Sequence, residues 1–247
     1  MSYSLEDIQK NWLRTNRVFE KNHKDLVQIF HSLIPVAFTV IESLSGRKKL
    51  AENCSYLLLS KGINHTLSMF LLLERGLIID ACLSARNGIE TFLMLELFAT
   101  DSTEKYFKQW SNGKEFKPFW VRKQLGESLK AIVRDVEIIF DDDFYDSVKK
   151  AYSFFSGITH SNLKSSEYSI REKLDGHFEV PTGGVIEEKE SLINCVFLVI
   201  CGGLIRSLLI TSAIFSTDLL DKIGTDVTKT QNKINKILSR IEDENKT

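Results

Sequence analysis

Apolar side chains recur at helical spacing through most of the chain, beginning close to its first residue. The first such pattern carries the inward face Leu5, Ile8, Trp12, Phe19, Leu26, Ile29 and Phe30. Ser4 is a suitable N-cap for it. Proline removes a hydrogen bond of the helix, so Pro35 is expected to kink or restart the helix. The following stretch is expected to end near Leu44.

The middle of the chain continues the helical pattern with several interruptions. A short helix is predicted over 50–60, stopped near Lys61-Gly62, and a long one from Ile63 to Phe98. Further helices are predicted over 103–110, 121–140 and 144–157, with a loop over 111–118. The acidic run at 141–143 is interpreted as capping carboxylates and not as a metal site.

A different pattern occupies residues 160–185. Apolar and polar positions alternate around Asp175-Gly176, a pair typical of a hairpin turn. A small β-hairpin insertion is therefore predicted near 167–181. An apolar helix follows from about Glu188, and a polar helix over 218–247 is expected to fray at its end.

These elements favour a mainly all-α fold, a multi-helix bundle with one hairpin insertion. The chain has 247 residues but only three prolines, and it shows no Pro/Gly/Ser-rich linker. A single domain over 1–247 is the simplest prediction. It would comprise N-terminal helices over 1–45, a core over 63–215 and a C-terminal helix over 218–247.

Leu192–Phe215 is long enough to cross a membrane. Arg206 lies near its middle, where a charge costs about 3 kcal/mol on insertion scales. We therefore expect a buried core helix and no membrane. The chain starts with a polar, acidic segment that lacks the apolar stretch of a secretory signal, so we expect a cytoplasmic protein.

The net charge is −1, which gives no general attraction to nucleic acid or anionic membranes but leaves room for a local basic patch. No two of the four cysteines have CxxC spacing, and most lie in apolar runs, so buried free thiols are expected. We predict no metal site, because ligand spacings such as HExxH are absent. Phosphate-binding and nucleotide-binding motifs are also absent, and no cofactor is predicted.

Two helices are expected to form the centre of the fold. One, roughly Leu71 to Phe98, carries the small residues Ala81, Ala85 and Gly88 on one stripe. The other, Leu192–Phe215, carries Gly202-Gly203 at its middle. Glycine within a helix usually has a packing reason, so the two small stripes are predicted to face each other.

The first of these helices also carries charges. A rotation of 100° per residue places Arg75, Arg86 and Glu90 on one face, and Arg86 and Glu90 can pair at i, i+4. Buried charges must be paired, so Arg206 on the second helix also needs a carboxylate. We predict one network of Arg86, Glu90 and Arg206, with Asp80 as a further candidate member. It is either a structural salt-bridge cluster or a pocket that binds an anionic group.

His160 follows a predicted helix, one turn after Ser156. It is a candidate general acid–base or phosphate-contacting residue, or a histidine that caps helix carbonyls. Serine hydrolase chemistry is disfavoured, because the chain has no GxSxG nucleophile elbow.

Residues 60–215 resemble a group of bacterial all-helical proteins of unknown function related to HEPN-like domains. The resemblance rests on Arg75, Asp80, Arg86 and Glu90 on one helix, and on Ser156 and His160 on a later one. Catalytic HEPN domains are dimeric, metal-independent ribonucleases that carry Arg-x4–6-His on one helix. The matches to that spacing here, Arg17…His23 and Arg171…His177, lie in the opening helix and across the predicted hairpin turn.

Two functions are therefore expected side by side. The first is an interaction or scaffold module, a homodimer or a binder of another protein, acting in bacterial stress or phage defence. The second is an endoribonuclease with Arg86, Glu90 and His160 as catalytic residues. Arg75, Asp80, Ser156 and Arg206 are the candidate binding residues, and RNA is the candidate nucleic-acid partner.

Overall fold

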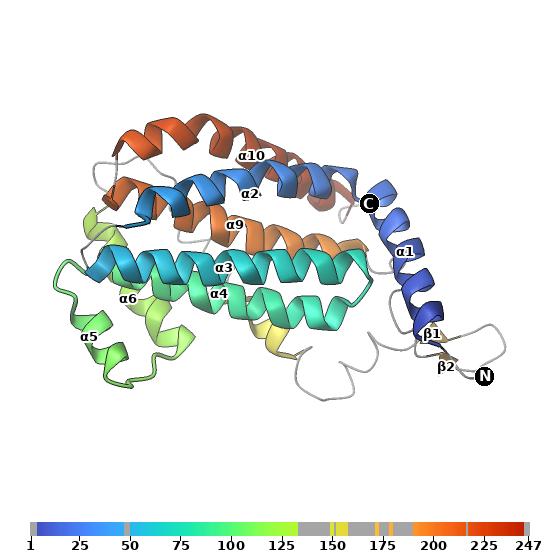
Figure 1. Ribbon diagram of the computed structural model, residues 1–247, viewed down its shortest axis with the longest axis horizontal. Coiled ribbons are helices and arrows are strands. Elements are labelled where there is room, and N and C mark those ends of the chain that lie inside the picture. Colours follow the sequence, from blue (N-terminus) through green and yellow to red (C-terminus); the bar gives the residue numbers. More distant parts are fainter. Residues whose placement is uncertain are drawn as a thin grey trace.

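The computed structural model describes residues 4–46, 50–132, 149–150, 152–157, 171–172, 178–179, 190–215 and 217–244. It confirms the all-α bundle (Figure 1). Its labelled helices are α1 (Leu5–Asn22), α2 (Lys24–Leu44), α3 (Leu50–Glu74), α4 (Ile78–Thr100), α5 (Lys105–Ser111), α6 (Pro118–Ile132), α9 (Glu190–Phe215) and α10 (Thr217–Glu244). Residues 149–150 and 152–157 are also helical.

The long helices run side by side, and α9 lies among them (Figure 1). Helices α2 and α10 cover one side of α9, and α3 and α4 cover the other. Helix α9 packs against all four, which explains why its 26 residues are apolar on nearly every face. Helices α5 and α6 lie beside α4, at the edge of the bundle away from α10. The site described below is on this edge.

The first break in the chain differs from the prediction. Helix α1 ends at Asn22 and α2 begins at Lys24, with His23 outside helical geometry at φ −116° and ψ 37°. Pro35 lies within α2 and does not interrupt it. It is exposed, so water can solvate the carbonyl that loses its donor. Proline inside a helix costs about 3 kcal/mol, and α2 offsets this by burying eight apolar side chains.

The second break also differs from the prediction. Helix α3 runs through Gly62 without interruption, and the turn falls at Arg75-Gly76-Leu77. Gly76 has a φ of 70°, the left-handed conformation that glycine adopts at little cost. The Gly76 N–H donates to the Leu73 carbonyl and the Leu77 N–H to the Leu72 carbonyl, both at 2.9 Å. This is a Schellman motif, and it turns the predicted single helix over 63–98 into the antiparallel pair of α3 and α4.

Helices α4 and α9 pack closely, as predicted, but the glycines of the two helices do not face each other. Phe92 of α4 fits against Gly203 of α9, where an added Cβ would lie 3.2 Å from the ring. The same ring fills the space beside Gly62 of α3, where an added Cβ would overlap it. Gly88 of α4 in turn accommodates Ile200 of α9. Each of these three glycines therefore makes room for a large side chain from a neighbouring helix. This packs the interior more closely than two glycine stripes facing each other would.

Two short strands, β1 (Arg171–Glu172) and β2 (Phe178–Glu179), pair antiparallel. Arg171 is opposite Glu179, and Glu172 is opposite Phe178. Residues 173–177, which include the predicted Asp175-Gly176 turn, lie outside the described residues. The hairpin insertion over 167–181 therefore stays a prediction beyond these four paired residues.

Two described helical stretches, Lys24–Leu44 and Leu192–Phe215, are long and apolar enough to cross a membrane. A core helix of a soluble protein meets the same criterion. In Leu192–Phe215, 72% of the most apolar window is buried inside the protein, against 39% in Lys24–Leu44. The bundle thus already covers most of the more apolar of the two.

Candidate functional site

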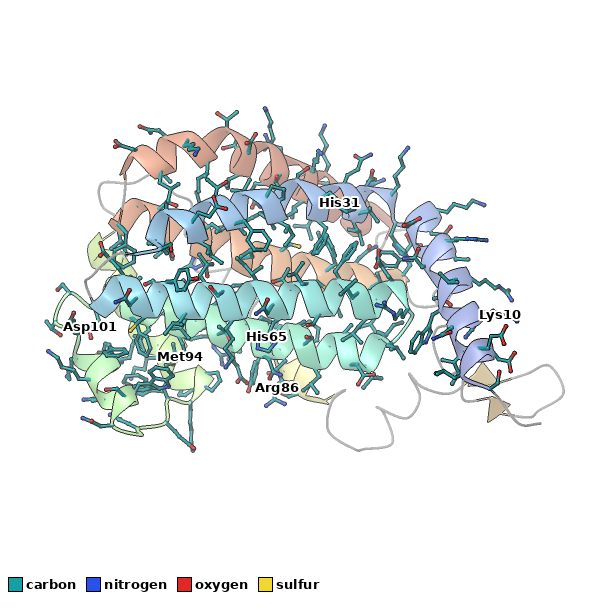
Figure 2. All side chains as sticks on the ribbon, in the orientation of Figure 1. Lys10, His31, His65, Arg86, Met94 and Asp101 are labelled. Carbon is teal, nitrogen blue, oxygen red and sulfur yellow. The ribbon has the colours of Figure 1, made fainter. Side chains whose placement is uncertain are left out.

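Arg86 and Glu90 of α4 form the predicted ion pair, and Tyr152 completes it. Arg86 Nε lies 3.4 Å from Glu90 Oε1. Arg86 Nη2 donates to the Tyr152 hydroxyl at 3.1 Å, and this hydroxyl donates to Glu90 Oε1 at 2.8 Å. The side chains of Arg86 and Glu90 retain 23% and 36% of their exposure, so the group borders on solvent. Figure 2 shows Arg86 on the side of α4 that faces away from α10.

A second arginine reaches the same tyrosine. The guanidinium carbon of Arg122, on α6, lies 5.7 Å from the centroid of the Tyr152 ring, and that of Arg86 lies 5.0 Å from it. Nη1 of Arg122 is buried and has no hydrogen-bond partner among the described residues. Burial lowers the pKa of Arg122, and Tyr152 acts in the opposite direction. We call Arg86, Glu90, Arg122 and Tyr152 the Tyr152 cluster.

His65 of α3 lies next to this cluster. Glu90 acts electrostatically on His65, and Figure 2 shows the His65 side chain above Arg86. The pKa of His65 is lowered by burial and by Lys61, and Glu90 opposes both. His65 Nε2 is buried and has no hydrogen-bond partner among the described residues. A half-buried imidazole whose pKa is lowered thus lies close enough to the Glu90 carboxylate to interact with it electrostatically.

Arg206 does not join Arg86 and Glu90, contrary to the prediction. Its Nε donates to Glu96 Oε2 at 2.9 Å, and the Ser207 hydroxyl donates to Glu96 Oε1 at 3.3 Å. The side chains of Arg206 and Glu96 are 6% and 2% exposed. Burial raises the pKa of Glu96, against the lowering effect of Arg206. This enclosed pair has the features of a structural ion pair and not of a ligand site.

Helix geometry explains why two clusters form. Glu96 follows Glu90 by six residues, which is about 9 Å along the axis and about 120° around it. Glu90 therefore points to the α6 side of α4, while Glu96 points to α9. Sequence spacing could show that Arg206 needs a carboxylate, but not which of the several on α4 it would reach.

The remaining predicted site residues are not part of the Tyr152 cluster or lie outside the described residues. Arg75 is in the α3–α4 turn, where it donates to the Leu71 carbonyl and lies 5.8 Å from the Trp12 ring centroid. Asp80 is exposed in the first turn of α4. Ser156 is half-buried, one turn after Tyr152. His160 lies outside the described residues, so its predicted approach to Arg86 stays a prediction.

Among the described residues, no group of three or more His, Cys, Asp or Glu side chains could hold a metal ion. Cys54, Cys82 and Cys201 are buried free thiols, and Cys195 is half-buried. Burial raises the pKa of Cys54 to about 11 and that of Cys82 to about 12. Such thiols stay protonated and are poor nucleophiles at neutral pH.

Tyr152 and Arg122 complete the Tyr152 cluster and were not singled out from the sequence, whereas Glu96 was noted as a charge on the first central helix but not as the partner of Arg206. A signal did exist for Arg122, which directly follows the buried Val121 on an amphipathic helix. A charge beside an inward stripe often has a buried partner. Tyr152 had no comparable signal, because an aromatic residue on a helix is most often part of the core.

Comparisons with known proteins identify no relative of this chain. No family model, no curated protein and no solved structure matches the chain.

Proposed function

We propose that this chain is a helical interaction module that binds RNA, with a backbone phosphate held at the Tyr152 cluster. The observation that carries the proposal is the convergence of Arg86 and Arg122 on one tyrosine. They come from different helices, and among the described residues one carboxylate, Glu90, accompanies them. The cluster therefore carries an excess of positive charge at a place that borders on solvent.

Arg122 supplies the donor that a phosphate would use. A buried guanidinium N–H without an acceptor loses hydration and gains no hydrogen bond, which costs on the order of 1–3 kcal/mol. An anionic oxygen would restore that bond and offset the charge. Arginine suits this role because its planar group can donate two parallel hydrogen bonds to phosphate.

The test is the affinity for a single-stranded RNA labelled with a fluorophore, measured by fluorescence anisotropy. Arg122→Gln removes the charge, and Arg17→Gln removes the same charge from an exposed position on α1. We expect Arg122→Gln to bind at least about tenfold more weakly, since one charge-assisted contact contributes roughly 1.5–3 kcal/mol. Arg17→Gln should bind like the wild type. Equal affinity of all three proteins would refute the proposal.

Cleavage of the bound RNA is a second candidate function. What favours it is the hydrogen bond between the Tyr152 hydroxyl and the Glu90 carboxylate, because groups able to accept and donate protons then lie at the proposed phosphate site. His160 is the further proton carrier that the sequence suggests. Incubation of total RNA with wild type, His160→Ala and Arg86→Ala decides it. Shorter RNA with the wild type alone supports cleavage, and equal profiles leave binding only.

The resemblance to HEPN-like domains suggests the oligomeric state, the cellular location and the biological role of the protein. It is the reason for proposing a dimer, a cytoplasmic location and a role in bacterial stress or phage defence. A protein partner that acts through this module belongs to the same proposal.

A further inference from the structure

The segment that supplies Arg122 has an unusual composition. Residues 105–123 contain six Lys or Arg and one Glu, in a chain whose net charge is −1. The same nineteen residues hold six aromatic side chains: Tyr106, Phe107, Trp110, Phe116, Phe119 and Trp120. Basic charge interleaved with aromatic rings is typical of surfaces that bind single-stranded nucleic acid.

Two of these aromatic residues, Trp110 and Phe116, line a cavity of about 350 Å³, together with Met94, Gly113, Lys114 and Glu115. Its size is within the range of small-molecule pockets. Trp110 remains 44% exposed. Its ring packs at a tilt against Phe98 and Phe107, with centroids 5.6 Å and 6.2 Å away. The indole is thus fixed by its neighbours and still accessible.

Phe116, which also lines the cavity, packs against a neighbouring ring as well. Phe116 and Trp120 stack with centroids 5.0 Å apart and planes 19° apart. Lys114 lies over both rings, at 5.4 Å and 5.8 Å from their centroids, and donates to Gln109 Oε1 at 2.8 Å. The cavity therefore combines an accessible indole with a held cation.

The cavity is adjacent to the Tyr152 cluster. Arg86, Glu90 and Met94 follow each other at intervals of four residues on α4, which places them along one face about 6 Å apart per step. Figure 2 labels Arg86 and Met94 along the same edge of this helix. About 12 Å along α4 therefore separates the proposed phosphate site from the residue that lines the cavity.

We propose that this cavity, formed by Met94 of α4, Trp110 of α5 and the loop between α5 and α6, stacks a base of the single strand whose phosphate lies at the Tyr152 cluster. The inference rests on the proposed function and extends it from phosphate to base. Every base has a π-face, so such stacking is tolerant of sequence. The cationic side chains nearby, Lys108, Lys114, Lys117 and Lys123, are exposed and suit the backbone of the strand.

The experiment separates base from phosphate by means of two probes. One is oligouridine about 12 nucleotides long, within the ~4–16 nucleotide site sizes of single-strand binders. The other is a strand of equal length that lacks bases. Trp110→Leu removes the π-face but keeps an apolar side chain in contact with Phe98. Phe38→Leu makes the same kind of change on α2, where Phe38 is 45% exposed.

We expect Trp110→Leu to bind oligouridine about 5- to 100-fold more weakly, since stacking contributes ~1–3 kcal/mol per base. Its affinity for the base-free strand should equal that of the wild type. Phe38→Leu should bind both probes normally, and Arg122→Gln should bind both weakly. Oligouridine should also quench tryptophan fluorescence in the wild type and not in Trp110→Leu.

Normal oligouridine binding by Trp110→Leu, with weak binding by Arg122→Gln, would overturn base stacking and leave the proposed function standing. Normal binding of both strands by Arg122→Gln would overturn the proposed function instead. If Trp110→Leu does not fold, Lys114→Gln is the variant to measure instead, because it changes an exposed side chain. It should weaken binding of both strands, and unchanged binding would count against the inference. Trp110-dependent binding to vesicles that contain phosphatidylserine, without binding of oligouridine, would overturn it in favour of a membrane surface.

Discussion

The buried pair of Arg206 and Glu96 gives a sharp test of the fold. Both side chains are almost fully enclosed, and their contact is 2.9 Å. Removal of one partner leaves the other charge uncompensated in the core, which costs about 3–5 kcal/mol. We therefore expect Glu96→Met and Arg206→Met each to lower the free energy of unfolding by that amount. Replacement of both should be far less harmful, because an apolar pair of similar volume is often neutral.

The assay is urea unfolding followed by circular dichroism, analysed as a double-mutant cycle. The exposed pair of Arg240 and Asp25 is a matched control, since its contact is 2.7 Å but its side chains are 62% and 58% exposed. Its cycle should give about 0–1 kcal/mol. Additive effects of the Glu96 and Arg206 substitutions, or single effects below about 1 kcal/mol, would refute the reasoning.

The same variants have a characteristic pH dependence. Burial already raises the pKa of Glu96, and loss of Arg206 removes a cation that opposes this. A carboxyl whose folded pKa is raised stabilises the protein below its unfolded pKa, and this contribution is lost as the pH rises through the folded value. Arg206→Met should therefore be less destabilised near pH 5 than near pH 8, by comparison with the wild type at each pH.

Two further predictions concern packing and histidine. Gly62→Ala should lower the free energy of unfolding by about 1–3 kcal/mol, because the added Cβ would overlap the Phe92 ring. Gly202→Ala should be neutral or stabilising by up to ~1 kcal/mol, because a Cβ added at Gly202 meets nothing within 4 Å. Equal urea midpoints for both would contradict this packing. Burial lowers the pKa of His23, so its contribution to stability is present above about pH 6.5 and is lost as the pH falls through the lower folded value. Between pH ~7.5 and ~5.5 the wild type should lose more stability than His23→Gln does, whereas substitution of the exposed His31 should leave the loss unchanged.

The sequence predicted the helical class well, because that depends on periodicity alone. The apolar stripe over Leu192–Phe215 and the polar, amphipathic pattern after it gave α9 and α10 close to their observed places. The positions at which one helix ends and the next begins were harder to predict. Gly62 and Gly76 look alike in sequence, but only Gly76 adopts a positive φ, and Gly62 makes room for Phe92. That distinction depends on a tertiary contact and is not visible locally.

The candidate site was predicted in part for a similar reason. Arg86 and Glu90 are neighbours on one helix, so their pairing follows from helical spacing. The tyrosine that joins them is more than sixty residues away in sequence, and Arg122 comes from yet another helix. The near-zero net charge also concealed the local excess on residues 105–123, because acidic residues elsewhere balance it.

The salt dependence of RNA binding tests the central claim most directly. For single strands, the logarithm of the binding constant falls with the logarithm of salt concentration by about 0.7 per neutralised phosphate. Between about 50 and 200 mM salt, the slope of Arg122→Gln should be smaller than that of the wild type by about 0.7. The slope of Arg17→Gln should match the wild type. Identical slopes for all three proteins would show that Arg122 holds no phosphate and would contradict the account.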